Sequence, residues 1–397
     1  GVPGFLDRAI QRRASTFDCV RVAHMRPSGS FNIELPPNVL VDDSLADSLA
    51  PTRSPMASRS RQITAVRNAL RRGHRAATDT GFVLRDVAHK SWLQQAFLRR
   101  ADSEGVYRWA RARSQPSIAY TFWLSAATEG LRAGWATTPI VSRAHGGDVY
   151  GYQHGWESIP GQAAQISSTD RVACVSRDAE SYLRARFPAQ ANKLVLRRLG
   201  VADLGGLAHH APGPSIRVIS VSSIDVNKRV DFIARSLLRL VQMGHAVEWN
   251  HYGDGPERTK LEAQIALKPD GFSVRLHGQV SLSEIHAELI DGGHHVFVNF
   301  SRSEGVPVSI IEAQCVGLPV VATDVGGSTE AAPRHLNEFV SVGASPQEAA
   351  EAILRALDHD SNEAYARRGH WAKNFDSALV YPAFAAELLA MARDDHG

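Results

Sequence analysis

The chain has few cysteines and no long hydrophobic run. Its three cysteines, Cys19, Cys174 and Cys315, lie far apart in the sequence and form no Cys-x-x-Cys pair. This spacing argues against a disulfide framework or a structural zinc site, and it indicates a reduced protein with buried thiols. No apolar stretch reaches the roughly 18 residues that a membrane-spanning helix needs. The start of the sequence has no signal-peptide pattern, so we expect a cytoplasmic protein.

Charge is nearly balanced over the whole chain, at +3, but it is unevenly distributed. Residues 1–200 hold 28 Lys and Arg against 16 Asp and Glu, a net +12, and residues 201–397 carry a net −9. The densest basic stretch contains Arg59, Arg61, Arg67, Arg71, Arg72 and Arg75. It indicates either a solvated helix face or docking on an anionic membrane or a phosphate-linked acceptor. Nucleic acid is not expected as a partner, because no recognised binding motif and no interleaved aromatics accompany the charge.

The second half of the chain alternates short apolar runs with helical patterns. The predicted strands are Ile216–Val221, Ala246–Tyr252, Val274–Gly278, His295–Phe300 and Leu318–Ala322. The predicted helices are Arg229–Met243, Glu257–Leu267, Leu282–Leu289 and Ser309–Val316. Such alternation is typical of a doubly wound parallel α/β domain.

The first half alternates less clearly, and we interpret it as α/β too. Its strand candidates are Cys19–His24, Ser117–Thr121, Pro139–Ala144, Arg171–Val175 and Lys193–Arg197. Residues 38–60 are rich in Pro, Ser and Asp, which predicts a long loop. Residues 201–215 are rich in Gly, Pro and His, which predicts a linker between domains 1–200 and 216–375. Residues 362–393 are interpreted as two helices broken near Asp376–Ser377, and residues 376–397 as a helix that packs back on the first domain.

The most informative segment is NFSRSEGVPVSIIEA, residues 299–313. A predicted strand ends at Phe300 and a helix begins near Val308. Ligands in open α/β sheets bind beyond the carboxyl ends of the strands, and the first turn of a helix attracts anions. Glu304 and Glu312 can both face such a site, where a carboxylate accepts hydrogen bonds from paired sugar or ribose hydroxyls.

Extended to EGVPVSIIEAQCVGLPVVAT, this segment resembles the donor signature of the GT-B retaining glycosyltransferases of family 4. The similarity is clearest over residues 170–340, and it is nearest to the exopolysaccharide transferases of colanic acid and amylovoran type. It implies two Rossmann-like doubly wound domains facing across a cleft. The first would bind the acceptor and the second the nucleotide-sugar donor. The final helix would return to the first domain.

The resemblance implies an activity as well as a fold. A hexose would move, with retention of configuration, from a UDP- or GDP-sugar to a saccharide or lipid-linked acceptor. The reaction would need no metal or other cofactor, and it would serve polysaccharide or glycoconjugate biosynthesis. The enzyme would lie in the cytoplasm, with a peripheral place on the inner membrane face.

Residue roles follow from the same resemblance. Glu304 would bind the donor sugar, Glu312 the ribose, and Lys228 the departing diphosphate. The family's usual arginine, five residues before this lysine, is Ser223 here, and Arg229 is the nearest replacement. The other implied donor contacts are Gly305, Val306, Pro307, Gly253, His277 and Gly278.

The first half supplies three more candidates. His145, in SRAHGGDVY, would contact the donor sugar as a catalytic residue. Asp148 in the same segment and Arg177 in VSR would contact the acceptor or the phosphate. Where the family opens with a strand and a Gly-rich loop, this sequence opens with GVPGFLDRAI. That departure suggests a start lying further upstream or a remodelled acceptor side.

Three alternatives compete with this interpretation. An inactive sugar-nucleotide-binding subunit is supported by Ser223 and by the unusual opening segment. Another GT-B enzyme, such as a phosphorylase or an epimerase, would share the same fold. A nicotinamide oxidoreductase is disfavoured, because no G-x-G-x-x-G follows a first strand.

Overall fold

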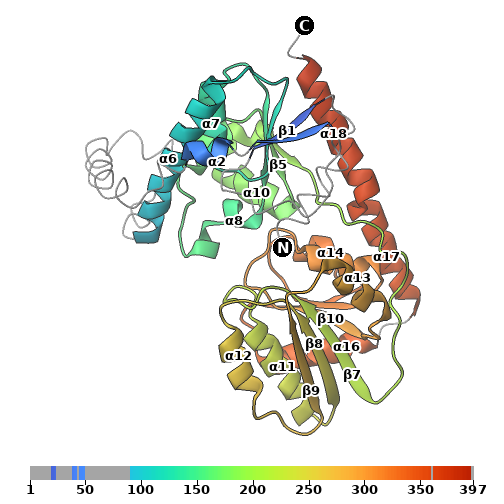
Figure 1. Ribbon diagram of the computed structural model, residues 1–397. Helices are drawn as coiled ribbons and strands as arrows, with labels where there is room; N and C mark the ends of the chain where they lie inside the picture. The colour runs from blue at the N-terminus through green and yellow to red at the C-terminus, as the bar shows by residue number, and fades with distance from the viewer. Residues whose placement is uncertain (1–18, 24–37, 43, 50–89, 359–360, 395–397) are drawn as a thin grey trace. The chain divides into compact units, whose positions relative to one another are not determined.

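The computed structural model describes residues 19–23, 38–42, 44–49, 90–358 and 361–394 (Figure 1). The described chain divides into two compact units. Unit 1 comprises the residues up to Arg197 together with those from Tyr381 onward, and unit 2 comprises Arg198–Val380. The basic stretch at residues 59–75 and the opening segment lie outside the described residues, so the hypotheses attached to them stay predictions.

The sheet of unit 2 has six parallel strands. They are β7 (Ser215–Val221), β8 (Ala246–Tyr252), β9 (Phe272–Gly278), β10 (Val296–Asn299), β11 (Val320–Thr323) and β12 (Glu338–Val340). Their spatial order is β12-β11-β10-β7-β8-β9. After β9 the chain returns to the other side of β7 and forms β10, which pairs with β7 through Val296 and Val218. The strand order therefore reverses between β7 and β10, which is where such sheets bind ligands.

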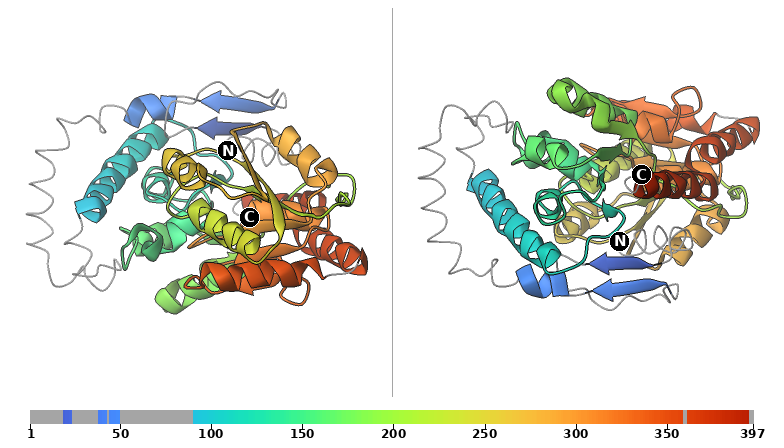
Figure 2. Two further views of the ribbon diagram at one scale, coloured as in Figure 1. Left: turned by 90° about the horizontal axis from the view of Figure 1, so that it is seen from below. Right: turned by 90° about the horizontal axis from the view of Figure 1, so that it is seen from above.

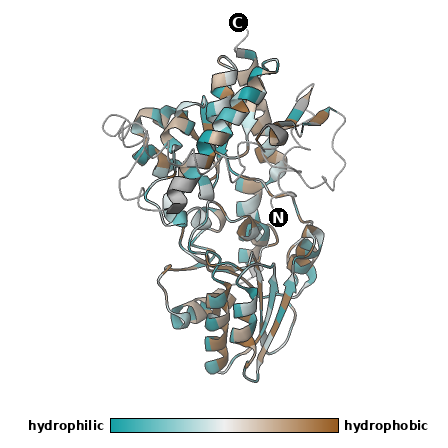
Figure 3. Ribbon diagram, turned by 60° about the vertical axis from the view of Figure 1, so that its left-hand side comes forward, coloured by the Kyte–Doolittle hydropathy of each residue, from teal (hydrophilic) through white to brown (hydrophobic). Residues whose placement is uncertain are grey.

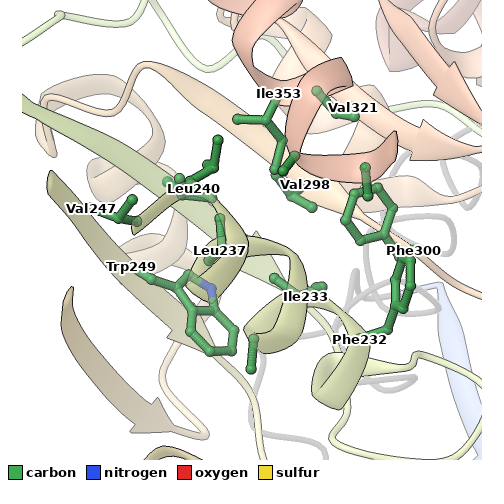
Figure 4. Packing of buried hydrophobic residues seen from close by; sticks show 14 of the residues in the cluster. Phe232, Ile233, Leu237, Leu240, Val247, Trp249, Val298, Phe300, Val321 and Ile353 are labelled. Atoms are coloured by element: carbon green, nitrogen blue, oxygen red, sulfur yellow. The ribbon is translucent and has the colours of Figure 1, made fainter. Parts of the chain in front are cut away.

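Helices pack on both faces of this sheet. They are α11 (Val230–Gln242), α12 (Arg258–Ile265), α13 (Leu282–Asp291), α14 (Val308–Cys315), α15 (Ser328–Ala331), α16 (Pro346–Leu357) and α17 (Ser361–Phe375). Figure 4 shows α11 side chains such as Leu237 gathered with Val298 of β10 and Ile353 of α16. Side chains alternate along a strand, so Phe297, next to Val298, points to the opposite face, where α14 contacts β10 and β11. In Figure 3, where brown marks hydrophobic residues, the strands of this sheet whose side chains are buried on both faces contain brown segments.

Unit 1 contains a four-stranded parallel sheet in chain order. Its strands are β3 (Ala119–Thr121), β4 (Ile140–Ala144), β5 (Arg171–Cys174) and β6 (Leu194–Leu196). Its helices include α6 (Lys90–Arg111), α7 (Ala127–Gly134), α8 (Gly146–Val149), α9 (Gln162–Ser167) and α10 (Arg177–Arg186), with 3-10 turns η2 (Gly151–His154) and η3 (Pro188–Lys193). Ser176 caps α10 by accepting a hydrogen bond from the amide of Ala179 at 3.1 Å.

The expectation of one long loop over residues 38–60 is wrong in its first part. Residues 39–42 (VLVD) form β2 (Val39–Asp42), which pairs in parallel with β1 (Val20–Ala23), drawn in blue in Figure 2. The short helix α2 (Ser44–Leu49) follows and packs on α6. A four-residue strand is too short to stand out from the surrounding Pro, Ser and Asp. The strand is stabilised instead by its pairing with β1 and by the burial of Val39, whereas Leu40 is half exposed.

The last helix, α18 (Ser377–Asp394), runs from unit 2 into unit 1, because the boundary between the units falls within it. The predicted break near Asp376–Ser377 is confirmed by the end of α17 at Phe375. Phe384 and Leu388 of α18 pack on the sheet of unit 1. On the same helix, Glu387 forms ion pairs with Arg171 and Arg197.

Two smaller expectations have mixed outcomes. Cys174 and Cys315 are buried, as expected, but Cys19 is exposed, so the prediction of buried thiols is wrong for that residue. Among the described residues, no helix combines the length and the hydropathy needed to cross a membrane.

Candidate functional site

The two loops at the switch point of unit 2 bring a lysine and a glutamate together. Lys228 follows β7, and Glu304 follows β10, the strand next to it in the sheet. Lys228 Nζ lies 2.7 Å from Glu304 Oε1. Glu304 is buried, with 7% of its surface exposed, while the Lys228 side chain keeps 25%. An ammonium group and a carboxylate therefore lie within hydrogen-bond distance of each other at the edge where this sheet type binds ligands.

The position of Lys228 is fixed by a network of hydrogen bonds in its own loop. Asp225 Oδ1 accepts hydrogen bonds from the amides of Asn227 at 2.8 Å and Lys228 at 2.9 Å. The Asn227 side chain in turn donates to the carbonyl of Ser303 at 3.1 Å. The carbonyl of Asn227 accepts a hydrogen bond from the amide of Arg302 at 2.7 Å. The loops after β7 and β10 are thus joined to each other, which positions Lys228 relative to Glu304.

Glu312 lies one turn into α14 and has a partner that the sequence did not suggest. His286, on α13, places Nε2 3.1 Å from Glu312 Oε1. Glu312 is buried, with 5% of its surface exposed, and the His286 side chain is 18% exposed. A ring nitrogen can donate to a carboxylate only if it carries a hydrogen, so Nε2 is the N–H nitrogen in this contact. One carboxylate oxygen is thereby engaged.

Two close approaches by glycine constrain the loops after β10 and β7. Gly326 has φ +51°, and a Cβ there would lie 1.8 Å from the carbonyl oxygen of Glu304. Its neighbour Gly327 donates a hydrogen bond to the carbonyl of Gly305 at 2.9 Å. Gly253 has φ +135°, and a Cβ there would lie 1.9 Å from the carbonyl oxygen of Ser222. Only glycine avoids these clashes, so both loops are held by neighbouring turns that need it.

The start of α14 lies next to Glu304 in sequence. The residues between Glu304 and the helix are Gly305, Val306 and Pro307, and Pro307 is the N-cap residue. Proline has no side-chain acceptor, and no side chain caps this end. The first amides of a helix lack intrahelical partners, and they favour anions. This end of α14 is therefore suited to a phosphate or another anionic group.

The remaining donor-site candidates have other partners. Ser223 donates a hydrogen bond to Asp225 at 2.5 Å, within the Lys228 loop. The guanidinium of Arg229 lies 4.2 Å from the centroid of the Phe232 ring and donates to the carbonyl of Val342 at 2.9 Å. The Arg229 guanidinium thus contacts Phe232 and Val342, whereas Lys228 and Glu304 contact each other.

At the far side of the switch point, His277 stacks flat on Tyr252, with ring centroids 4.2 Å apart. His277 Nε2 also lies 2.9 Å from Asn250 Oδ1. Gly278, the next residue, accepts a hydrogen bond from the amide of Gly253 at 2.8 Å. These residues lie together at the carboxyl ends of β8 and β9, where His277 is exposed and Tyr252 is buried.

In unit 1, His145 follows β4 and begins α8. Its Nε2 lies 3.0 Å from the carbonyl oxygen of Phe122. Its ring packs against those of Phe122 and Trp123, with centroid distances of 4.8 and 4.4 Å. Burial, together with the nearby Arg143, lowers the pKa of His145 to about 3. The imidazole is therefore neutral at physiological pH.

Asp148 has a different environment from Glu304 and Glu312. Its carboxylate accepts hydrogen bonds from the backbone amides of Leu124, at 2.8 Å, and His145. Burial raises the pKa of Asp148 well above its usual range, although these amides lower it in part. Its contacts are those of a residue that holds the β3 and β4 loops together. Arg177, the first residue of α10, is exposed.

No group of three or more side chains suited to binding a metal ion is found in the described parts of the chain.

Comparisons with known proteins find similarity to glycosyltransferases. Residues 215–359 match the family model described as Glycosyl transferases group 1. A human protein named as part of phosphatidylinositol N-acetylglucosaminyltransferase is 28% identical over 178 residues, 43% of this chain and 35% of that protein. WcaL of Salmonella typhimurium, whose name assigns it to colanic acid biosynthesis, is 27% identical over 193 residues, 44% of this chain and 45% of that protein. The chain thus spans less than half the length of these curated relatives.

Among solved structures, the pneumococcal O-GlcNAc transferase GtfA, in complex with UDP and GlcNAc, matches with a TM-score of 0.58 and 17% identity. The match covers 76% of this chain and 61% of GtfA. This likeness shows the fold, which is that of the GT-B glycosyltransferases, with two Rossmann-like units. The switch point that holds Lys228, Glu304 and Glu312 lies within residues 215–359. The chain therefore carries a glycosyl transferases group 1 domain, in its second unit, within a GT-B fold.

Proposed function

We propose that this chain is a retaining glycosyltransferase that takes a UDP-sugar as donor and transfers the sugar to a hydroxyl group of a saccharide or lipid-linked acceptor. The observation that carries the proposal is the Lys228–Glu304 pair at the topological switch of unit 2, beside the N-terminus of α14. A nucleoside diphosphate sugar needs a cation and amides for its phosphates and carboxylates for its hydroxyls. These groups come together at this edge of the sheet.

Each side chain then has a distinct role. Lys228 and the first amides of α14 hold the diphosphate and stabilise the charge that develops on it as the bond to the sugar breaks. Glu304 accepts hydrogen bonds from the sugar hydroxyls. Glu312, oriented by His286, accepts hydrogen bonds from the ribose hydroxyls.

The reaction replaces one bond to the anomeric carbon with another. The acceptor oxygen forms a bond to that carbon while the bond to the β-phosphate oxygen breaks. The acceptor's proton passes to the departing phosphate oxygen, and attack from the same face retains the configuration. No carboxylate nucleophile is needed, in contrast to retaining glycosidases, whose paired carboxyl groups flank the bond. The charge on the diphosphate is met by Lys228 and the helix amides without a metal.

The names of the relatives direct the choice of donor and acceptor. The human relative and the pneumococcal structure are both named for the transfer of N-acetylglucosamine, and the latter binds UDP. UDP-N-acetylglucosamine is therefore the first donor to test. Phosphatidylinositol is the first lipid acceptor to test, after the human relative, and a colanic acid unit is the first saccharide, after WcaL.

The deciding experiment is a thermal-shift screen against UDP, GDP, ADP and dTDP, each with and without its attached sugar. A ligand that binds only the folded state raises the melting temperature. We expect UDP to stabilise the wild type and Lys228→Ala to lose that stabilisation. Lys260→Ala, which changes an exposed lysine on α12, is the matched control. No shift with any nucleotide would overturn the proposal.

A second candidate function is a sugar-nucleotide-binding subunit without catalysis. It is favoured by Ser223, which the structure shows bound to Asp225 at a position where the resemblance leads one to expect arginine. Nucleotide stabilisation without UDP release from any sugar donor would support it.

For an active enzyme we expect the rate of UDP release to be unchanged by EDTA. Loss of activity that Mg²⁺ or Mn²⁺ restores would contradict the metal-free mechanism.

A further inference from the structure

Unit 1 holds an exposed tryptophan in a loop at the carboxyl end of its sheet, the end at which open α/β sheets bind ligands. Trp123 lies in the loop after β3, and the carboxyl ends of β3 and β4 lie at the same edge because the strands are parallel. Its ring packs against two neighbours, Phe122 at 5.5 Å and His145 at 4.4 Å between centroids. Even so, 41% of Trp123 remains exposed to solvent.

Single exposed apolar side chains are common and need no explanation on their own. The backbone around Trp123 gives it more weight, because each residue of the tripeptide 122–124 is held by a group from the next strand and helix. The carbonyl of Phe122 contacts His145 Nε2 at 3.0 Å. The carbonyl of Trp123 accepts a hydrogen bond from Ser142 Oγ at 3.2 Å, and the amide of Leu124 donates to Asp148 at 2.8 Å.

Three separate polar contacts therefore fix a loop whose central side chain is left partly in water. A fixed indole offers a large flat contact surface, and little conformational entropy is lost when it binds a ligand. Its face carries partial negative charge, whereas the C–H bonds on one face of a pyranose ring carry partial positive charge. The two surfaces are complementary in both shape and charge. A lipid chain, by contrast, would fit a continuous apolar surface better than a single ring beside a half-buried polar His145.

We propose that Trp123 is the stacking platform for a pyranose ring of the saccharide acceptor. His145, which packs against the indole, sets its tilt, with an interplanar angle of 48°. Asp148 supports the platform without contacting the acceptor. Its carboxylate accepts hydrogen bonds from the amides of Leu124 and His145, which holds the two loops that carry Trp123 and His145. The acceptor of the transferase is accordingly a saccharide, and its ring, more than any lipid attached to it, supplies the affinity at this position. This inference rests on the proposed function, since it assigns the acceptor of that reaction.

The experiment uses the full chain and two readouts of UDP release from UDP-N-acetylglucosamine, or from whichever UDP-sugar stabilises the wild type. UDP release in water alone reports on the donor site. Its stimulation by methyl glycosides of glucose, galactose, mannose and N-acetylglucosamine reports on the acceptor site. The variants are Trp123→Ala, Trp123→Phe, and Tyr365→Ala as the matched control. Tyr365 is 68% exposed, and it lies on α17 in unit 2.

We expect Trp123→Ala to raise the KM for the stimulating glycoside about tenfold or more, equivalent to about 1.4 kcal/mol. Its UDP release in water and its stabilisation by UDP should stay within about twofold of the wild type. Trp123→Phe should recover part of the loss because a ring is restored, and Tyr365→Ala should behave as the wild type.

The contrary outcomes are distinct. The proposal that Trp123 is a stacking platform would be contradicted by an unchanged glycoside KM in Trp123→Ala. A wild type that hydrolyses the donor at a rate independent of any saccharide would contradict it as well. So would a variant that loses binding to phosphatidylinositol vesicles while its glycoside KM is unchanged, since that result would assign the indole to a lipid. A wild type that neither binds nor hydrolyses any UDP-sugar overturns the proposed function itself.

Discussion

Asp148 of unit 1 and the pair Glu304 and Glu312 of unit 2 lie at the same kind of sheet edge, but their hydrogen-bond partners differ. In unit 1, Asp148 accepts hydrogen bonds from backbone amides, which cannot move away without unfolding the loops. In unit 2, Glu304 and Glu312 pair with the side chains of Lys228 and His286. Side-chain partners can rotate and exchange one contact for another. We therefore propose that the carboxylates bound to side chains take up a ligand and that the one bound to main-chain amides serves the fold.

The same contrast separates the histidines. His145 is kept neutral by burial, and its Nε2 faces a backbone carbonyl. His286 pairs with a carboxylate through the same ring atom. His145 therefore contributes a fixed uncharged surface beside Trp123, and His286 contributes orientation to an acid. A polar residue in a motif can thus be assigned a structural or a ligand-binding role from the kind of partner it has.

The largest expected effect tests this contrast directly, with Glu304→Gln set against Asp148→Ala. In the proposed reaction Glu304 holds the sugar at which the bond breaks and pairs with Lys228, and removal of one preorganised electrostatic contact in an active site lowers a rate by about a hundredfold to a thousandfold. We expect Glu304→Gln to lose UDP-sugar turnover by at least the lower figure, while its melting temperature stays close to that of the wild type. UDP release and thermal unfolding, measured on the same preparation, check both parts.

Asp148→Ala should show the reverse balance. It leaves two amides without their acceptor, and each buried amide without a partner destabilises the fold by about 1–3 kcal/mol. The melting temperature should therefore fall clearly. If this variant loses activity, its remaining activity should be proportional to the fraction of protein that is folded. A Glu304 variant that unfolds, or an Asp148 variant that is stable but inactive, would reverse the contrast between the two edges.

Much of unit 2 was predictable from sequence because its elements are encoded locally. The strand run Ala246–Tyr252 has the bounds that the sequence predicted, and the helix predicted over Ser309–Val316 begins and ends one residue earlier. The local pattern of strand, loop and helix around Glu304 also placed that residue at the carboxyl end of a strand. These features depend on side chains that are neighbours in the sequence.

The partners of the site residues were not predictable in the same way. His286 meets Glu312 across 26 positions, because α13 and α14 pack together on one face of the sheet. Nothing in the sequence around His286 distinguishes it from a surface histidine. No local pattern indicates that Asp148 is held by the amide of Leu124, since that contact depends on how β3 lies beside β4. Residue types can be read from a motif, but their partners depend on topology.

A smaller effect is expected at His286. In His286→Ala the Glu312 carboxylate loses its orienting donor, and a hydrogen bond to a charged group contributes about 1.5–3 kcal/mol. We expect UDP to bind about tenfold more weakly, and 2′-deoxy-UDP to be affected less, because it lacks a hydroxyl that Glu312 would hold. His286→Gln retains an N–H donor and should recover part of the affinity. Isothermal titration calorimetry with both nucleotides measures this difference. An equal loss for the two nucleotides would separate His286 from ribose binding.

The smallest expected effect concerns His145 and acid stability. In the folded chain its pKa is lowered to about 3, whereas an ordinary histidine has a pKa near 6.5. The unfolded chain therefore binds one more proton between these values, and the free energy of unfolding falls as the pH drops from about 6.5 toward 3. The slope is at most about 1.4 kcal/mol per pH unit for one such group. In His145→Asn that contribution is removed. The melting temperature of this variant should fall less steeply between pH 7 and pH 5 than that of the wild type. If both fall in parallel, His145 is charged in the folded state, and the neutral surface beside Trp123 is not what unit 1 presents.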